Sequence, residues 1–232
     1  MKKKLIVNAD DFGKSVDITR AIIFAHRYGV LSSTTVMTRG IAFEFASKLI
    51  KETPNLKTGL HIDLDSIFLM REPNRFYKKL IKITHPMKIK IKDEINKQLD
   101  EFLKAGFVLT HLDSHHHSHM HPEVLPIVAS KAKELGVLIR FYNGYYDSSK
   151  FFYKNLEKEV LIPILKHFDL KCPYFFIDNF DLDSNYEAGE VMIHPGFLER
   201  WRAWDFVKCL NPELKKNIEE KNIEIVSFSD LK

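Results

Sequence analysis

The segment Thr110-His111-Leu112-Asp113-Ser114-His115-His116-His117-Ser118-His119-Met120-His121 holds six of the eleven histidines in this 232-residue chain. A short apolar run at residues 107–109 comes before it and reads as a buried strand. Residues 122–128 follow and begin a helix, with a proline near its first turn. The histidines therefore stand where a strand ends and a helix begins, which is where α/β proteins place their functional residues.

The histidine segment is typical of a metal site. Imidazole is the commonest protein ligand for divalent transition metals, and a neighbouring polar group usually fixes which ring nitrogen faces the ion. Asp113 and Ser114 are candidates for that support. The alternative is a polar surface loop that binds no ion. Spacing alone does not select the ligands, because three HxxxH pairs overlap: His111 with His115, His115 with His119, and His117 with His121. Since His115 belongs to two pairs, it is the strongest single candidate.

The rest of the chain alternates strand patterns with helix patterns. Short apolar or alternating runs predict strands at residues 5–9, 34–37, 57–64, 107–109, 137–141, 174–177, 190–196 and 223–228. Helical spacing predicts helices from residue 15 or 17 to 29, at 42–51, 91–104 and 124–135, and a last helix that ends near 217–222. Residues 65–84 are predicted to be irregular, and 147–165 helical or irregular.

This order predicts a parallel α/β fold in one domain. Polar residues recur at the carboxyl ends of the predicted strands, and a (βα) barrel of about seven strands gathers those ends around one mouth. An open doubly wound sheet is the alternative. It calls for a glycine-rich phosphate loop after the first strand, and the sequence has none there.

Composition narrows the classes of protein. A net charge of +4 without a basic stripe of interleaved aromatics disfavours a nucleic-acid partner. Two cysteines are too few for a disulfide scaffold or a cysteine zinc site, and they indicate a reducing compartment. The apolar run after the N-terminal lysines is too short for a signal peptide, and no run is long enough to span a membrane. We therefore expect a cytoplasmic protein. A homodimer is compatible with the sequence, but no pattern requires one.

Six polar residues at predicted strand ends would share one pocket: Asp10, Asp11, His61, His115, Arg140 and His194. Two histidines and one carboxylate leave open positions on a divalent ion, as in a hydrolytic site. Because neighbouring strand residues point to opposite sides, the two aspartates are expected to differ in role. One would bind the ion, and the other would take a proton from water.

Two further side chains have expected roles in such a site. His194, across the mouth, would protonate a leaving group. Arg140 would orient the base aspartate or meet developing charge. As an alternative, Arg140 pairs with Asp10 or Asp11 only to hold the mouth together.

Four motifs resemble those of the YdjC-like carbohydrate deacetylases, the family that includes the chitooligosaccharide deacetylases. They are NADDFG at residues 8–13, TGLHIDL at 58–64, THLDSHHHSHMHPE at 110–123 and MIHPGF at 192–197. The resemblance implies a single YdjC-like deacetylase domain over residues 1–232, folded as an irregular β/α barrel of the glycoside hydrolase and deacetylase type. It also implies metal-dependent removal of an acetyl group from an N-acetylated sugar, of the chitooligosaccharide or N-acetylglucosamine type.

Carried over residue by residue, the resemblance implies Asp11, His61 and His115 as metal ligands, Asp10 as general base and His194 as general acid. His119 is the next candidate for a ligand. The family implies magnesium, whereas two imidazoles and a carboxylate suit zinc better than a hard, oxygen-preferring ion.

Two other functions use similar residues. A metal-dependent phosphoesterase usually needs two metals about 4 Å apart and more bridging carboxylates than the sequence offers. A non-catalytic barrel that binds carbohydrate or metal needs neither Asp10 nor His194.

Overall fold

The computed structural model describes residues 2–68, 82–141, 157–170, 175–177, 180–183 and 185–231. Within them, eight strands form one sheet in which every pair is parallel. The strands are β1 (Lys4–Phe12), β2 (Ser33–Val36), β3 (Lys57–Ile62), β4 (Leu109–Ser114), β5 (Leu138–Ile139), β6 (Phe175–Ile177), β7 (Ala188–Ile193) and β8 (Glu224–Val226). Their order is β5-β4-β3-β2-β1-β7-β6, and β8 pairs with β1.

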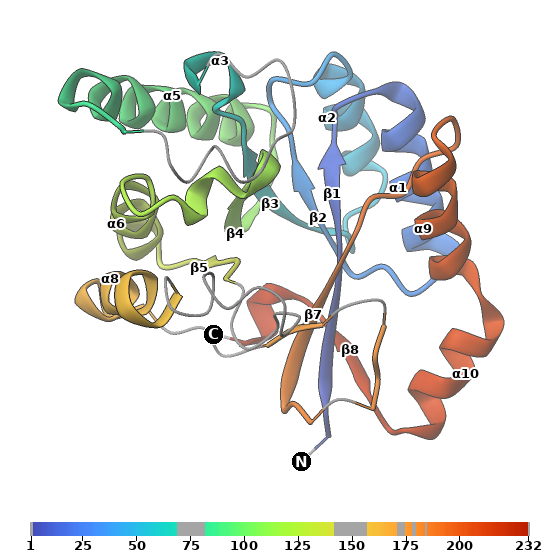
Figure 1. Ribbon diagram of the computed structural model, residues 1–232. Coiled ribbons are helices and arrows are strands. Elements are labelled where there is room, and N and C mark those ends of the chain that lie inside the picture. The colour runs from blue at the N-terminus through green and yellow to red at the C-terminus, as the bar shows by residue number, and fades with distance from the viewer. Residues whose placement is uncertain are drawn as a thin grey trace.

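Strand β1 is the axis of the sheet (Figure 1). It is buried from Leu5 to Phe12, as expected of a parallel strand covered on both faces. One edge pairs with β7 from Lys4 to Ala9. The other edge pairs first with β8, at Lys4–Ile6, and then with β2 from Asn8 onward. Strand β8 therefore fills the position beside β1 that β2 leaves open.

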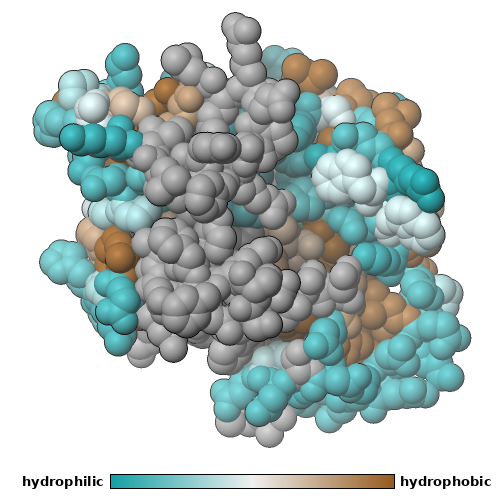
Figure 2. Space-filling model, viewed as in Figure 1, coloured by the Kyte–Doolittle hydropathy of each residue, from teal (hydrophilic) through white to brown (hydrophobic). Residues whose placement is uncertain are grey.

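Helices cover the sheet on both flanks. They are α1 (Val16–Tyr28), α2 (Phe43–Lys51), α3 (Asp65–Phe68), α5 (His85–Lys104), α6 (Leu125–Leu135), α8 (Ile162–His167), α9 (Arg200–Leu210) and α10 (Pro212–Glu220). Figure 1 shows α5, α6 and α8 on one flank and α1, α9 and α10 on the other. Hydrophilic side chains cover α10 (Figure 2). No helix among the described residues is long and apolar enough to cross a membrane.

Local sequence explains where several helices begin and end. Helix α1 starts at Ser15, whose side chain accepts a hydrogen bond from the amide of Ile18. Helix α6 ends at Gly136, which adopts the left-handed conformation with φ 63°. At the end of α1, a Cβ on Gly29 would lie 2.4 Å from the carbonyl oxygen of Cys209. Glycine at this position therefore lets the ends of α1 and α9 meet.

The predicted parallel α/β fold is confirmed. The sheet is a curled half-barrel: its order runs from β5 to β6, and the described residues include no pair that joins those two strands. The helices differ from the prediction in two places. Helix α5 begins at His85 rather than at residue 91, with Pro86 in its first turn. Helix α9 was not predicted. Within the predicted segment 147–165, residues 147–156 lie outside the described ones.

Candidate metal centre

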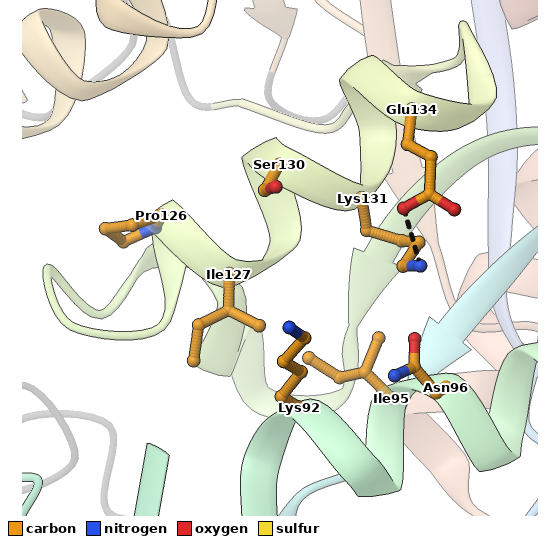
Figure 3. Close-up of a pocket in the computed structure, with 8 residues that line it drawn as sticks. All are labelled: Lys92, Ile95, Asn96, Pro126, Ile127, Ser130, Lys131 and Glu134. Atoms are coloured by element: carbon orange, nitrogen blue, oxygen red, sulfur yellow. Dashed lines mark hydrogen bonds and ion pairs between the residues drawn. The ribbon is translucent and has the colours of Figure 1, made fainter. Parts of the chain in front are cut away.

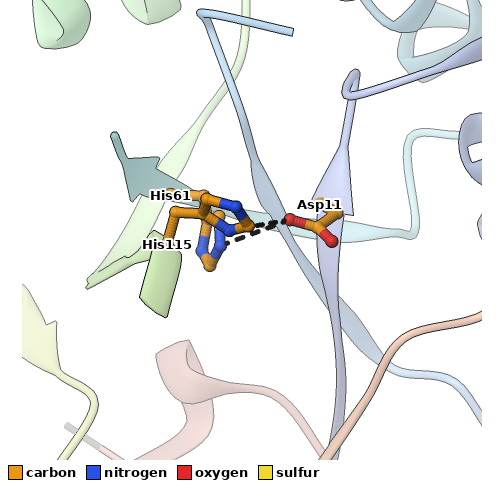
Figure 4. Close-up of side chains that lie close together, drawn as sticks. All are labelled: Asp11, His61 and His115. Atoms are coloured by element: carbon orange, nitrogen blue, oxygen red, sulfur yellow. Dashed lines mark ion pairs between the residues drawn. The ribbon is translucent and has the colours of Figure 1, made fainter. Parts of the chain in front are cut away.

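Three side chains from different strand ends converge at the carboxyl edge of the sheet (Figure 4). Asp11 comes from β1, His61 from β3, and His115 is the first residue after β4. The Nε2 atom of His61 lies 3.6 Å from Asp11 Oδ1, and the Nδ1 atom of His115 lies 3.2 Å from the same oxygen. One ligand atom from each residue falls within 4.8 Å of the other two. We call these three residues the Asp–His–His set.

A backbone irregularity separates the two neighbouring aspartates of β1. Asp11 has φ 73°, and the register between β1 and β2 shifts between Ala9 and Phe12. A left-handed conformation costs a residue other than glycine about 1 kcal/mol, so the surrounding contacts must hold it in place. Because the chain turns here, both carboxylates lie at the edge of the sheet that carries the histidines, although they are consecutive.

The ring of His61 is oriented by a carboxylate. Its Nδ1–H donates to Asp113 Oδ1 at 2.7 Å, which leaves Nε2 facing Asp11. Metal-binding histidines usually have such a partner on their second nitrogen. Asp113 was expected to support a histidine, and it supports one on the neighbouring strand. Ser114 Oγ lies 2.6 Å from Nδ1 of His119.

Electrostatics favours a cation between these groups. Burial alone would raise the pKa of Asp11, but the nearby rings of His115 and His61 hold that pKa well below its ordinary value. Burial would lower the pKa of His61, yet Asp113 and Asp10 raise it to about 9. Burial lowers the pKa of His115. The site therefore gathers more negative than positive charge around His61.

The Asp–His–His set fits a divalent ion. Asp11 Oδ1 is buried and accepts no hydrogen bond, although two imidazole nitrogens face it. An orphaned buried oxygen of this kind is costly unless a cation or donor satisfies it. One carboxylate and two imidazoles are the ligands of zinc and similar transition metals.

Two other groupings of acidic residues and histidines share residues with this set, and the first of them is less suited to hold an ion. The first joins Asp10, His61 and Asp113, but Arg140 already binds both of its carboxylates. The second joins Asp65, His115 and His116, and shares His115 with the Asp–His–His set.

His119 does not fit the role of an additional ligand. Its Nδ1 contacts Ser114, and its Nε2–H donates to the carbonyl oxygen of Arg140 at 2.9 Å. Both ring nitrogens are therefore occupied. The helical HxxxH spacing to His115 is also broken, because His116 and His117 have positive φ angles of 54° and 57°.

Arg140 is a buried hub that holds Asp10 in place. Its two terminal nitrogens donate to the two oxygens of Asp10, each at 2.7 Å. It also contacts Asp113 Oδ2 at 2.6 Å and donates from Nε to Glu190 Oε1 at 2.6 Å. Arg140 is fully buried. Of the expected roles, this geometry matches pairing with Asp10 and orienting it, rather than direct contact with a substrate.

Asp10 and His194 face each other beside the Asp–His–His set. Burial raises the pKa of Asp10, but Arg140 and His61 outweigh it and hold that pKa far below its ordinary value. His194 Nε2 lies 3.8 Å from Asp10 Oδ2, and 22 % of the His194 side chain is exposed. Burial lowers the pKa of His194, although Asp10 opposes the shift. The backbone amide of His194 donates to Asp205 of α9 at 2.9 Å.

Helix α9 supplies contacts that sequence reasoning missed. Arg202 is buried and donates to Asp11 Oδ2 at 2.6 Å and to Glu199 Oε2 at 2.6 Å. Lys14 lies 3.4 Å from the same oxygen of Asp11. The signal available in the sequence was the run Trp201-Arg202-Ala203-Trp204, which follows the MIHPGF motif closely and has aromatics at helical spacing.

A pocket of about 300 Å³ lies elsewhere, between α5 and α6 (Figure 3). Lysines and isoleucines line it, among them Lys92, Ile95, Ile127 and Lys131. It contains no histidine or aspartate. We therefore place the candidate site at the strand ends and not in this pocket.

Comparison with known proteins gives concordant matches. The model of a family described as YdjC-like protein matches residues 4–220. A carbohydrate deacetylase of Brevibacillus brevis is 34% identical, over 98% of this chain and 99% of the relative. A carbohydrate deacetylase of Clostridium beijerinckii is 31% identical, over 98% of this chain and 100% of the relative.

Solved structures resemble the fold. A putative cellobiose-phosphate cleavage protein of Enterococcus faecalis has a TM-score of 0.76 at 23% identity, covering 100% of this chain and 99% of that one. A lactam utilization protein of Thermus thermophilus has a TM-score of 0.60 at 13% identity, covering 97% of this chain and 99% of that one. At these identities the likeness concerns the fold alone.

Proposed function

The chain belongs to the YdjC-like protein family, and from this membership we propose that it is a metal-dependent carbohydrate deacetylase. Such an enzyme hydrolyses the amide bond that joins an acetyl group to an amino sugar. Relatives named carbohydrate deacetylase align over nearly the whole chain. The observation that carries the proposal is the position of Asp10 and His194 beside the Asp–His–His set.

Asp11, His61 and His115 would hold one divalent ion. When bound, such an ion lowers the pKa of a water molecule and polarises a carbonyl oxygen. The ligand chemistry favours zinc, and the family resemblance offers magnesium as the alternative. Lys14 and Arg202 keep Asp11 Oδ2 engaged, so Oδ1 remains available to the ion.

Asp10 would be the group that takes the proton from the attacking water. Arg140 holds both of its oxygens, and Asn8 donates to Oδ1 at 3.0 Å, so the carboxylate has a fixed direction. An oriented base of this kind contributes about 10²- to 10⁴-fold to a rate.

His194 would protonate the departing amine. Its ring is partly exposed and lies across from Asp10, so it can reach a leaving group that Asp10 does not contact. The backbone contact with Asp205 fixes its position at the end of β7. The substrate would be a small N-acetylated sugar or oligosaccharide, of the N-acetylglucosamine or chitooligosaccharide type.

Acetate release tests this proposal. The substrates are N-acetylglucosamine, N,N′-diacetylchitobiose and longer chitooligosaccharides, each with zinc, magnesium or a chelator. We expect release only with metal, and an Asp10→Asn variant should lose roughly 10²- to 10⁴-fold in rate while it still binds metal. Asp100→Asn, an exposed change of the same chemistry on α5, is the matched control and should be as active as the natural protein. If metal binds but no N-acetyl sugar yields acetate, the proposal fails.

A further inference from the structure

A tryptophan in the first turn of α9 stands at the border of the candidate site. The ring of Trp201 lies 5.4 Å from the ring of His194, at an interplanar angle of 59°. The guanidinium carbon of Arg202 lies 4.3 Å from the Trp201 ring centroid. Despite both contacts, 49% of Trp201 is exposed.

The ring of Trp201 is held by residues that are themselves fixed. Arg202 is tied to Asp11 and Glu199, and His194 to Asp205. Among the described residues, none accepts a hydrogen bond from the Trp201 indole N–H, and the contacts with His194 and Arg202 fix the orientation of the flat apolar ring.

We propose that Trp201 is a stacking platform for a sugar ring of the substrate. This inference rests on the proposed function, because it concerns a sugar that reaches His194. One face of a pyranose ring is lined by C–H groups, and its rim carries hydroxyl groups. An indole matches both, since it combines an apolar body with a polar N–H and loses little entropy on binding.

The segment before Trp201 carries two further exposed apolar side chains. Phe197 and Leu198, in the segment that leads from β7 to α9, are 46% and 85% exposed. In Figure 2, bulky side chains of intermediate hydropathy gather where Figure 1 places α9. Because the ring of Trp201 lies 5.4 Å from the ring of His194, a substrate of more than one sugar can place one ring at His194 and the next against Trp201.

A sugar suits this surface better than a permanent protein partner. Trp201 contacts the His194 ring, and His194 Nε2 is 3.8 Å from Asp10. A second protein chain seated on Trp201 would cover the exposed part of His194 and close the approach to the leaving group. A substrate that enters the site contacts both residues without this conflict.

Kinetics with two substrates tests the platform. We expect Trp201→Ala to lower kcat/KM for N,N′-diacetylchitobiose by about tenfold more than for N-acetylglucosamine, mainly through KM. Trp201→Phe should recover most of the loss, because it restores an aromatic face. The matched control is Trp204→Ala, because Trp204 is an exposed tryptophan on the next turn of α9. For this variant, kcat/KM for each of the two substrates should stay within about twofold of the natural protein. Equal losses on both substrates, or none, would overturn the inference.

Fluorescence gives a readout that does not depend on activity. The chain has two tryptophans, so Trp204→Phe leaves Trp201 as the sole indole, and a second change, Asp10→Asn, blocks turnover. Titration with N,N′-diacetylchitobiose should shift the emission saturably, at lower concentration than with N-acetylglucosamine. A shift without acetate release by the natural protein would refute the deacetylase and retain the platform. Acetate release without an emission shift would refute the platform and retain the deacetylase.

Loss of a dimer in Trp201→Ala, seen by sedimentation, would assign the surface to self-association and overturn the inference.

Discussion

At the scale of single residues, histidines close in sequence differ according to what surrounds each ring. His115 points toward Asp11, whereas both ring nitrogens of His119 are bound within the protein. His111 is buried and stacks on Phe228, with ring centroids 3.5 Å apart, and burial lowers its pKa to about 3. The histidine-rich segment thus contributes one residue to the Asp–His–His set.

Glu190 gives a prediction on pH and stability. Burial raises its pKa to about 7 from an ordinary 4.5, although Arg140 donates to it. The folded state therefore binds a proton more tightly than the unfolded chain. That stabilisation is complete below pH 4.5 and is lost as the pH rises through 7. Glu190→Gln keeps an acceptor for Arg140 but does not titrate.

We expect the unfolding free energy of Glu190→Gln, relative to the natural protein, to rise by about 3 kcal/mol between pH 4.5 and 7. Urea unfolding of both proteins at several pH values in this window measures it. A difference that stays constant with pH would mean that Glu190 is ionised in the folded protein throughout.

At the scale of elements, α9 connects the candidate site to the flank of the sheet that carries α1. Trp201, Arg202 and Asp205 lie on it, and each contacts Asp11 or His194. Near its end, Cys209 approaches Gly29 closely. The helix is therefore packed at both ends, and its first turn forms one wall of the site.

The ion pair between α9 and β1 can be tested by removing one partner. Arg202→Gln should destabilise the protein by about 3 kcal/mol, because Asp11 then stays buried with a weaker cation partner, Lys14. Added zinc should recover part of this loss by neutralising Asp11. Arg200→Gln, an exposed change on the same turn, is the control and should be nearly neutral. Equal stability of the two variants in urea unfolding would contradict the assigned ion pair.

At the scale of the whole molecule, the parallel sheet sets the location of the site. Because every described strand pair is parallel, the carboxyl ends meet at one edge, and β1 places its two aspartates between residues from β3, β4 and β7. Side chains more than one hundred residues apart in sequence thus come into contact, as with Arg140 and Asp10, which are 130 positions apart.

A bound ion should stabilise the whole fold. At a free concentration about a thousand times its Kd, a ligand adds about 4 kcal/mol, which for a domain of this size raises Tm by roughly 10 °C. We therefore expect thermal unfolding of the metal-free protein to shift upward by this amount when zinc is added. His115→Gln should unfold at nearly the same temperature with and without zinc. A shift of the same size in His115→Gln would place the ion elsewhere.

The sequence by itself determined the class of fold and the main candidate residues. Apolar runs alternating with helical spacing are local signals, and they predicted the parallel sheet. Asp10, Asp11, His61, His115, Arg140 and His194 could be named because each stands at a predicted strand end or carries a motif. The proline at the start of α5 was a local signal too, but the predicted helix began after it.

Only the tertiary structure decided how these residues pair. It assigned Asp113 to His61, Arg140 to Asp10, Asp113 and Glu190, and Arg202 to Asp11. It also took His119 out of the candidate ligands. None of these pairings follows from local spacing, because each joins residues from different strands or helices. They depend on the register and curl of the sheet and on the left-handed turn at Asp11, which tertiary packing alone can hold in place.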